Sequence, residues 1–164
     1  MSHESSGSFS GSSSELPASE PADALPPIAV DALPERSRAA LARAGWASLM
    51  PVQARTIPYL VARRDLMVQS HTGSGKTGAF VLPILERLDP ARKACQALIL
   101  VPTRELARQV TDETAMLGGD PALVVPIYGG ASYEPQLEGL RRGAPVVVGT
   151  PGRILDHLLR QSLV

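Results

Sequence analysis

Residues 70–77 read SHTGSGKT, and this stretch decides the fold because it has the composition of a phosphate-binding loop. The preceding Asp65–Gln69 predicts a short strand, and Lys76–Leu88 predicts a helix that Pro83 should bend. A glycine-rich turn between a strand and a helix directs backbone N–H groups at an anion. The alternative is a polar turn with a surface lysine, and the strand–loop–helix context argues against it.

The residue types in this loop suit a nucleotide phosphate. Gly73 and Gly75 permit close approach of phosphate, and Lys76 supplies a point charge for the β and γ phosphates. Thr77 offers a hydroxyl to Mg²⁺, so Lys76 and Thr77 are the expected catalytic pair. The chain has 14 Arg and only two Lys, so a lysine here indicates a need for a compact ammonium. The expected phosphate site comprises Ser70, His71, Thr72, Gly73, Ser74, Gly75, Lys76 and Thr77, with His71 at a variable loop position.

Strand-like and helix-like segments alternate along the rest of the chain. The expected helices are 34–44, 52–62, 105–117, 133–141 and 153–159, and the expected strands are 96–101, 122–128 and 145–149. Continuous apolar strands separated by helices predict an α/β fold with a parallel sheet covered on both faces. Such a sheet binds its ligands at the carboxyl ends of the strands.

The N-terminal region differs from the rest of the chain. Residues 1–27 are rich in Ser, Pro and acids, which predicts a disordered tail, either a solvated extension or an arm for protein partners. Residues 1–31 carry five acids and no Lys or Arg, so the remainder has a formal charge of +5, which suits a polyanionic partner. We expect neither a signal peptide nor a membrane span. The single Cys95 fits a reducing cytosol, and a cytoplasmic location is expected.

Four further motifs accompany the loop in a fixed order. GWASLMPVQ ends at Gln53, PTREL occupies 102–106, a glycine pair lies at 129–130, and TPGR occupies 150–153. Together with SHTGSGKT, this set closely resembles the N-terminal RecA-like domain of DEAD-box ATP-dependent RNA helicases, over residues 28–164. The resemblance implies a RecA-like P-loop domain with a parallel sheet flanked by helices. Ser70, where the general P-loop pattern has glycine, is ordinary in that family.

The resemblance implies an ATP site beside the loop. Gln53 looks like the glutamine of the Q motif, whose amide matches the N6 and N7 edge of adenine. Trp46 holds the aromatic position of the same motif, although core packing is an equally weighted alternative. The family usually has Pro-Thr where this chain has Leu49-Met50. It also has an aromatic at the place of Ile28, which offers adenine no stacking face.

The resemblance also implies contacts to the sugar-phosphate backbone of RNA, without sequence specificity. Hydroxyls would come from Thr103 and Thr150, and charge from Arg104 and Arg153, with an internal salt bridge as the alternative for either arginine. Close backbone approach would come from Gly129, Gly130 and Gly152, and an ordinary turn is the alternative for the glycine pair. His157 is expected to be solvated on the last helix.

The Asp-Glu-Ala-Asp and Ser-Ala-Thr motifs of the family do not occur in the 164 residues. The resemblance places their strands between the P-loop strand and the other three, so we expect an incomplete domain with a split sheet. Such a chain should be poorly stable and hydrolyse little ATP. The main interpretation is the N-terminal part of an ATP-dependent RNA helicase that uses ATP and Mg²⁺. The alternatives are a non-catalytic ATP- and RNA-binding module and, less favoured, a small-molecule kinase.

Overall fold

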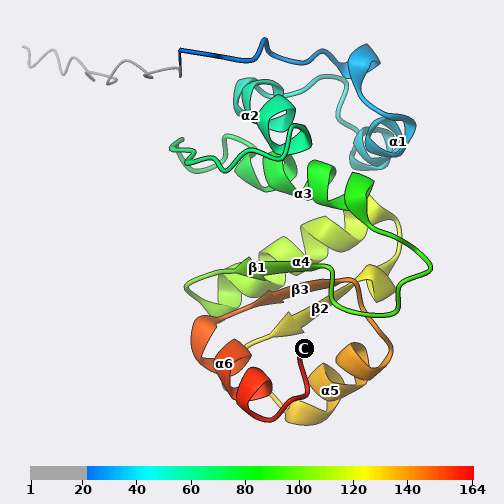
Figure 1. Cartoon of the computed structure of the whole chain (residues 1–164), viewed down its shortest axis with the longest axis vertical. Coiled ribbons are helices and arrows are strands. Elements are labelled where there is room, and N and C mark those ends of the chain that lie inside the picture. Colours follow the sequence, from blue (N-terminus) through cyan, green and yellow to red (C-terminus); the bar gives the residue numbers. More distant parts are fainter. Residues whose placement is uncertain (1–21) are drawn as a thin grey trace, which may run out of the picture.

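The computed structural model describes residues 22–164 (Figure 1), so residues 1–21 of the predicted tail lie outside the described part. The last residues of that tail contact the folded body. Asp23 forms an ion pair of 2.6 Å with Arg64, and the Leu25 N–H donates to the Tyr59 hydroxyl at 2.9 Å. The packed part of the chain therefore includes residues that precede Ile28.

Helices and short strands follow one another as the periodicity predicts, with ends that differ from the predicted ones by at most two residues. The helices are α1 (Glu35–Ala44), α2 (Pro51–Val61), α3 (Lys76–Arg87), α4 (Arg104–Gly118), α5 (Tyr133–Arg141) and α6 (Pro151–Leu159), with 3₁₀ turns η1 (Val30–Ala32) and η2 (Pro121–Leu123). The strands are β1 (Ala97–Leu100), β2 (Val124–Ile127) and β3 (Val146–Gly149). Gly45 and Gly119 end α1 and α4 in the left-handed region, as expected for glycine after a helix.

The three strands in the described part of the chain form a parallel sheet in the order β1-β3-β2. The buried β3 lies between the other two, and its Val148 pairs with Ile99 on one side and Pro126 on the other. Figure 1 shows α4 over one face of the sheet and α5 and α6 over the other. Parallel pairing and helices on both faces agree with the predicted α/β class.

A second layer of helices lies beyond α4, on the side away from the sheet (Figure 1). Here α1 and α3 pack against α4, and α2 packs on α3. A buried apolar cluster that includes Leu41, Ile57, Leu82 and Leu117 joins all four helices. This cluster positions the start of α3, and therefore the loop that precedes it, relative to the sheet.

The predicted strand at residues 65–69 is wrong for the described structure, where this segment pairs with no other strand. It runs along the outside of the molecule before α3 (Figure 1), and the Met67 side chain is 97 % exposed. β1 is also less buried than predicted, because Leu98 and Leu100 are 46 % and 55 % exposed. Residues 65–69 have no hydrogen-bonded neighbour, which local sequence cannot supply, so they form no strand. β1 pairs with β3 but is an edge strand whose Leu98 and Leu100 side chains remain in solvent.

Candidate functional site

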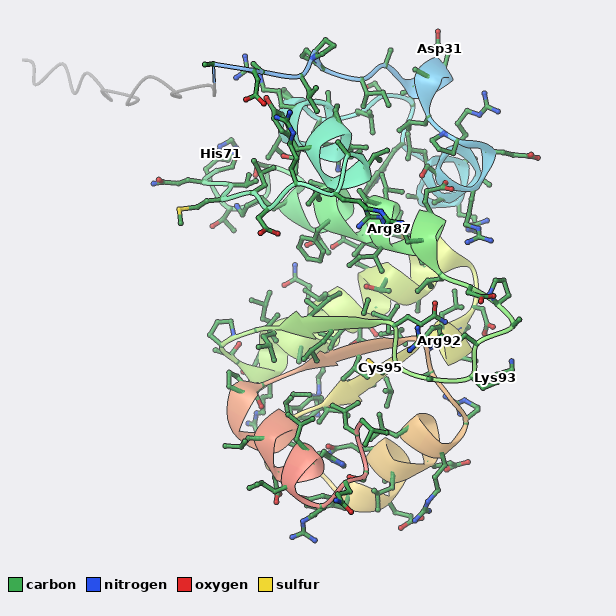
Figure 2. All side chains as sticks on the ribbon, in the orientation of Figure 1. Asp31, His71, Arg87, Arg92, Lys93 and Cys95 are labelled. Carbon is green, nitrogen blue, oxygen red and sulfur yellow. The ribbon has the colours of Figure 1, made fainter. Side chains whose placement is uncertain are left out.

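The SHTGSGKT segment forms a tight loop that leads directly into α3. Gly75 precedes the helix with φ 85°, and Gly73 has φ 80°, both in the left-handed region that favours glycine. A Cβ added to Gly73 would have no described atom within 4 Å, so the backbone is open on that side. Ser74 is buried, whereas His71 and Thr72 are exposed, with His71 at the outer left of Figure 2.

The Lys76 ammonium lies inside the loop and is held by the loop's own carbonyls. It donates to Ser70 O and His71 O, each at 2.6 Å, and reaches Ser74 Oγ at 3.5 Å. A compact ammonium with three donors suits this cluster of oxygens. The same geometry would let phosphate oxygens replace the carbonyls, so the residues fit the phosphates of a nucleotide.

The Thr77 hydroxyl contacts an acid on the neighbouring helix. It donates a hydrogen bond to the half-buried carboxylate of Glu113 in α4. Burial raises the pKa of Glu113 above its ordinary value, and the bond from Thr77 partly opposes that shift. The hydroxyl predicted to hold Mg²⁺ would therefore have to exchange this carboxylate for the metal.

Gln53 is fully buried in the first turn of α2 and connects this helix to the loop. Its Oε1 accepts from the Met50 N–H at 2.9 Å, and its Nε2 donates to Gly75 O at 3.1 Å. The amide thus donates and accepts at once, as predicted, but both partners here belong to the protein. A Cβ at Gly75 would lie 2.8 Å from Gln53 Nε2, so the loop glycine permits this contact.

Trp46 and Ile28 take part in the helical core next to Gln53. Both pack against the apolar cluster of α1 to α4, and the Ile28 N–H donates to Ala54 O at 2.9 Å. The Trp46 ring lies over α3, where a Cβ at Gly78 would come within 2.8 Å of Cζ3. In this structure Trp46 packs in the core, which is one of the two interpretations left open by the sequence.

The PTREL and glycine-pair motifs meet at the carboxyl ends of β1 and β2. Thr103 caps α4 by accepting from the Leu106 N–H at 3.2 Å. Arg104 forms a salt bridge with Glu105 at 2.8 Å, which is the alternative interpretation of this residue, but both side chains are exposed, so the pair contributes little stability. Gly130 has φ 76°, and a Cβ there would lie 3.3 Å from Arg104 Nη1, so the guanidinium reaches the glycine pair.

The TPGR motif reaches the same loop from the other side. Arg153 Nη1 donates to Ala131 O at 3.2 Å, directly after the glycine pair. Thr150 precedes α6, and its N–H donates to Ile127 O at 2.9 Å, which ties this motif to β2. Gly152 is exposed with open space around it, as is Gly129. Three motifs predicted separately are thus brought together around residues 129–131.

The predicted solvation of His157 is wrong, because its side chain is fully buried. Its Nδ1 lies 2.8 Å from Ser162 Oγ, and its Nε2 lies 3.3 Å from Gln136 Oε1. Gln136 Nε2 in turn donates to Ser132 O at 3.0 Å. α6 turns this residue towards α5, a packing arrangement that a short helical pattern does not specify.

This burial predicts that acid destabilises the fold through His157. Burial lowers the pKa of His157 below its ordinary value, and the nearby charge of Arg153 acts in the same direction. The unfolded chain therefore takes up the proton first, and stability falls as the pH drops below about 6.5. We expect the free energy of unfolding, measured by urea titration, to decline between pH 7.5 and 5.5, by at most about 1.4 kcal/mol per pH unit from this group.

The check is a pair of substitutions with the urea series repeated for each. His157→Gln should flatten the pH dependence, whereas His71→Gln, in the exposed loop, should leave it unchanged. Equal slopes for the two variants would contradict the assignment.

Two side chains near the motifs were not predicted from the sequence. Glu113 lies three residues after the buried Val110 of α4, and an acid at such a position on the apolar side of a helix is a usable signal. Tyr133 contacts Arg153, with the guanidinium carbon 4.3 Å from the ring centre. No pattern along the chain indicates the contact between Tyr133 and Arg153.

Two negative findings hold within residues 22–164. No helix there is long and apolar enough to cross a membrane. That part of the chain also contains no group of three or more His, Cys, Asp or Glu side chains placed to hold a metal ion.

Comparison with known proteins agrees with the site geometry. The family model of the DEAD/DEAH box helicase matches residues 50–164. The chain is 52 % identical over 126 residues to the ATP-dependent RNA helicase DeaD of Mycobacterium tuberculosis, covering 76 % of this chain and 22 % of that protein. It is 43 % identical over 125 residues to the DEAD-box ATP-dependent RNA helicase CshA of Bacillus licheniformis, covering 76 % and 26 %.

A solved structure extends the similarity to the fold. The DEAD box protein from Methanococcus jannaschii superposes with a TM-score of 0.72 at 38 % identity, covering 81 % of this chain and 37 % of the other. The chain spans about a quarter of the length of the curated relatives it matches. On the family model, the relatives and the shared fold, the chain belongs to the DEAD/DEAH box helicase family.

Proposed function

We propose that this chain is the ATP- and RNA-binding N-terminal part of an ATP-dependent RNA helicase. The observation that carries the proposal is the convergence of PTREL and TPGR on residues 129–131, where Arg104 lies beside Gly130 and Arg153 Nη1 is 3.2 Å from Ala131 O. Loops with arginines and glycines, of which Arg104 is exposed and Arg153 half-buried, suit a phosphate backbone. Contacts of this kind hold a strand without reading its bases, which fits RNA of any sequence.

The nucleotide side of the proposal depends on the loop before α3. Ser70 to Gly75 would surround the phosphates, Lys76 would contact them, and Thr77 would hold Mg²⁺ after releasing Glu113. Gln53 would recognise adenine after exchanging one of its present partners, Met50 N–H or Gly75 O. Bound ATP would supply the phosphoryl group whose hydrolysis drives local unwinding in the complete enzyme. We expect this chain alone to show little RNA-stimulated hydrolysis.

The first test is nucleotide binding by lysine variants. Lys76→Ala should weaken binding of fluorescently labelled MgADP by about tenfold, because a charge-assisted contact to phosphate is lost. Lys93→Ala is the matched control, since Lys93 is the chain's other lysine and is exposed (Figure 2). Titration with MgGDP under the same conditions should show weaker binding than MgADP. Equal affinities for the two nucleotides would count against a role of Gln53 in adenine recognition.

The second test measures RNA binding by arginine variants. Arg104→Ala and Arg153→Ala should each weaken binding of a labelled single-stranded RNA. Each should also reduce the salt slope, which is the steepness with which the logarithm of the binding constant falls with the logarithm of the salt concentration, by about one. Arg141→Ala is the control, because Arg141 also pairs with a neighbouring acid, Glu134 at 3.1 Å, but lies in the last turn of α5. If Arg141→Ala has the same effect as the other two, binding is a property of net charge and not of this site. RNA-stimulated hydrolysis by the unaltered chain would instead favour an autonomous enzyme.

A further inference from the structure

We infer that Tyr133 is a positioning residue for Arg153 in backbone binding, an inference that depends on the proposed function. Tyr133 is the first residue of α5, immediately after the loop of the glycine pair. The Arg153 guanidinium carbon lies 4.3 Å from the centre of its ring. Tyr133 therefore connects the glycine-pair loop to the arginine of TPGR.

The face of α6 that contacts Tyr133 is defined by helical spacing. Arg153, His157 and Arg160 are separated by four and three residues, so they lie along one side of the helix. The His157 ring centre is 4.9 Å from that of Tyr133, and the Arg160 guanidinium carbon is 4.8 Å from it. The buried His157 thus supports the ring, and the arginines contact it from the ends of the stripe.

The partners that hold Arg153 are electrically neutral. Arg153 is half-buried, and within residues 22–164 it forms no ion pair with an acid; its contacts are Ala131 O and the Tyr133 ring. Arg104 and Arg160 differ, since Glu105 and Asp156 lie 2.8 and 3.1 Å from them. A guanidinium held by a carbonyl and an aromatic face keeps its full charge and most of its donors for an anion. An orienting carboxylate would instead offset the charge that attracts phosphate.

The hydroxyl of Tyr133 is not part of this arrangement. It is buried, and in the described part of the chain it has no hydrogen-bond partner. The aromatic ring and not the hydroxyl is then what Arg153 requires. Phenylalanine should replace Tyr133 without loss, and an aliphatic residue should not.

The experiment uses the whole chain and fluorescence anisotropy with a labelled single-stranded oligouridine across a salt series. Tyr133→Leu should weaken binding by about three- to tenfold and lower the salt slope, whereas Tyr133→Phe should stay within about twofold of the unaltered chain. The double variant Tyr133→Leu/Arg153→Ala should bind no more weakly than Arg153→Ala alone, because the tyrosine acts through the arginine. Upfield-shifted side-chain resonances of Arg153, retained with Phe and lost with Leu, would report the ring contact without RNA.

The outcomes separate this inference from the proposed function. If Arg153→Ala leaves RNA binding unchanged, the proposed contact of Arg153 is wrong and the inference is wrong with it. If Arg153→Ala weakens binding and Tyr133→Leu does not, only the role of Tyr133 is overturned. A further loss in the double variant would also overturn it, because Tyr133 would then act on RNA or on the fold independently of Arg153.

Discussion

Gly149→Ala is expected to destabilise the chain by about 3 kcal/mol or more, because this position has no room for a methyl group. A Cβ there would collide with the Ile127 carbonyl oxygen of β2 and lie 2.7 Å from Ile154 Cδ1 in α6. The same carbonyl accepts the Thr150 N–H that ties the start of α6 to the sheet. Backbone atoms of a central sheet cannot move aside as a flexible side chain can, so the strain would be distributed over β2, β3 and α6.

Gly152→Ala is the matched control for this change. Gly152 is three residues further on and within α6, and a Cβ there would have no described atom within 4 Å. Alanine should leave stability unchanged or raise it by up to about 1 kcal/mol, because it is the better helix former. Urea unfolding followed by far-UV circular dichroism measures both variants. Similar urea midpoints for Gly149→Ala and Gly152→Ala would contradict the close packing described at the end of β3.

Gln53→Leu is expected to lower the free energy of unfolding by about 2–4 kcal/mol and to loosen the phosphate loop. The substitution preserves volume but leaves two groups next to a fully buried site, Met50 N–H and Gly75 O, without their hydrogen bonds. Each unsatisfied group costs about 1–3 kcal/mol, and greater apolar burial offsets part of the sum. The single Trp46 packs beside Gly78 next to Gln53, so its fluorescence reports this region during urea unfolding.

Two further variants sharpen this test. Gln109→Leu, on the exposed side of α4, should change stability by no more than about 0.5 kcal/mol. Gln53→Glu should be at least as damaging as Gln53→Leu near pH 7.5, because a buried carboxylate would face the Gly75 carbonyl. Its stability should recover partly as the pH falls, since the protonated acid can donate to that carbonyl. A Gln53→Glu variant that is stable and insensitive to pH would show that the amide is not needed for the Gly75 contact.

Local rules predicted most of the helices and the class of the sheet. The predicted helix 133–141 matches both ends of α5, and glycines 45 and 119 follow the ends of two other helices, as is usual for glycine. These features depend on neighbours within a few residues of the chain. Parallel pairing followed from the alternation of strands and helices, which leaves few other topologies.

Long-range contacts explain the features of the structure that local patterns do not predict. Residues 65–69 have the composition of a strand, but pairing depends on a neighbouring strand and not on composition. His157 looks like a surface residue in isolation, and its burial depends on Gln136 and Ser162 arriving from other segments. The exposed face of β1 likewise reflects what packs on the strand, not the apolarity of its residues.

The sequence by itself determined the kinds of residues at the site, the order of the motifs, and the places of PTREL, the glycine pair and TPGR after β1, β2 and β3, because these depend on local chemistry and chain direction. Only the tertiary structure decided which groups meet: Gln53 with Gly75, Thr77 with Glu113, and Tyr133 with Arg153. The two residues of each pair are at least 20 positions apart along the chain. Their contacts follow from how helices pack on a sheet, which is a property of the whole folded chain.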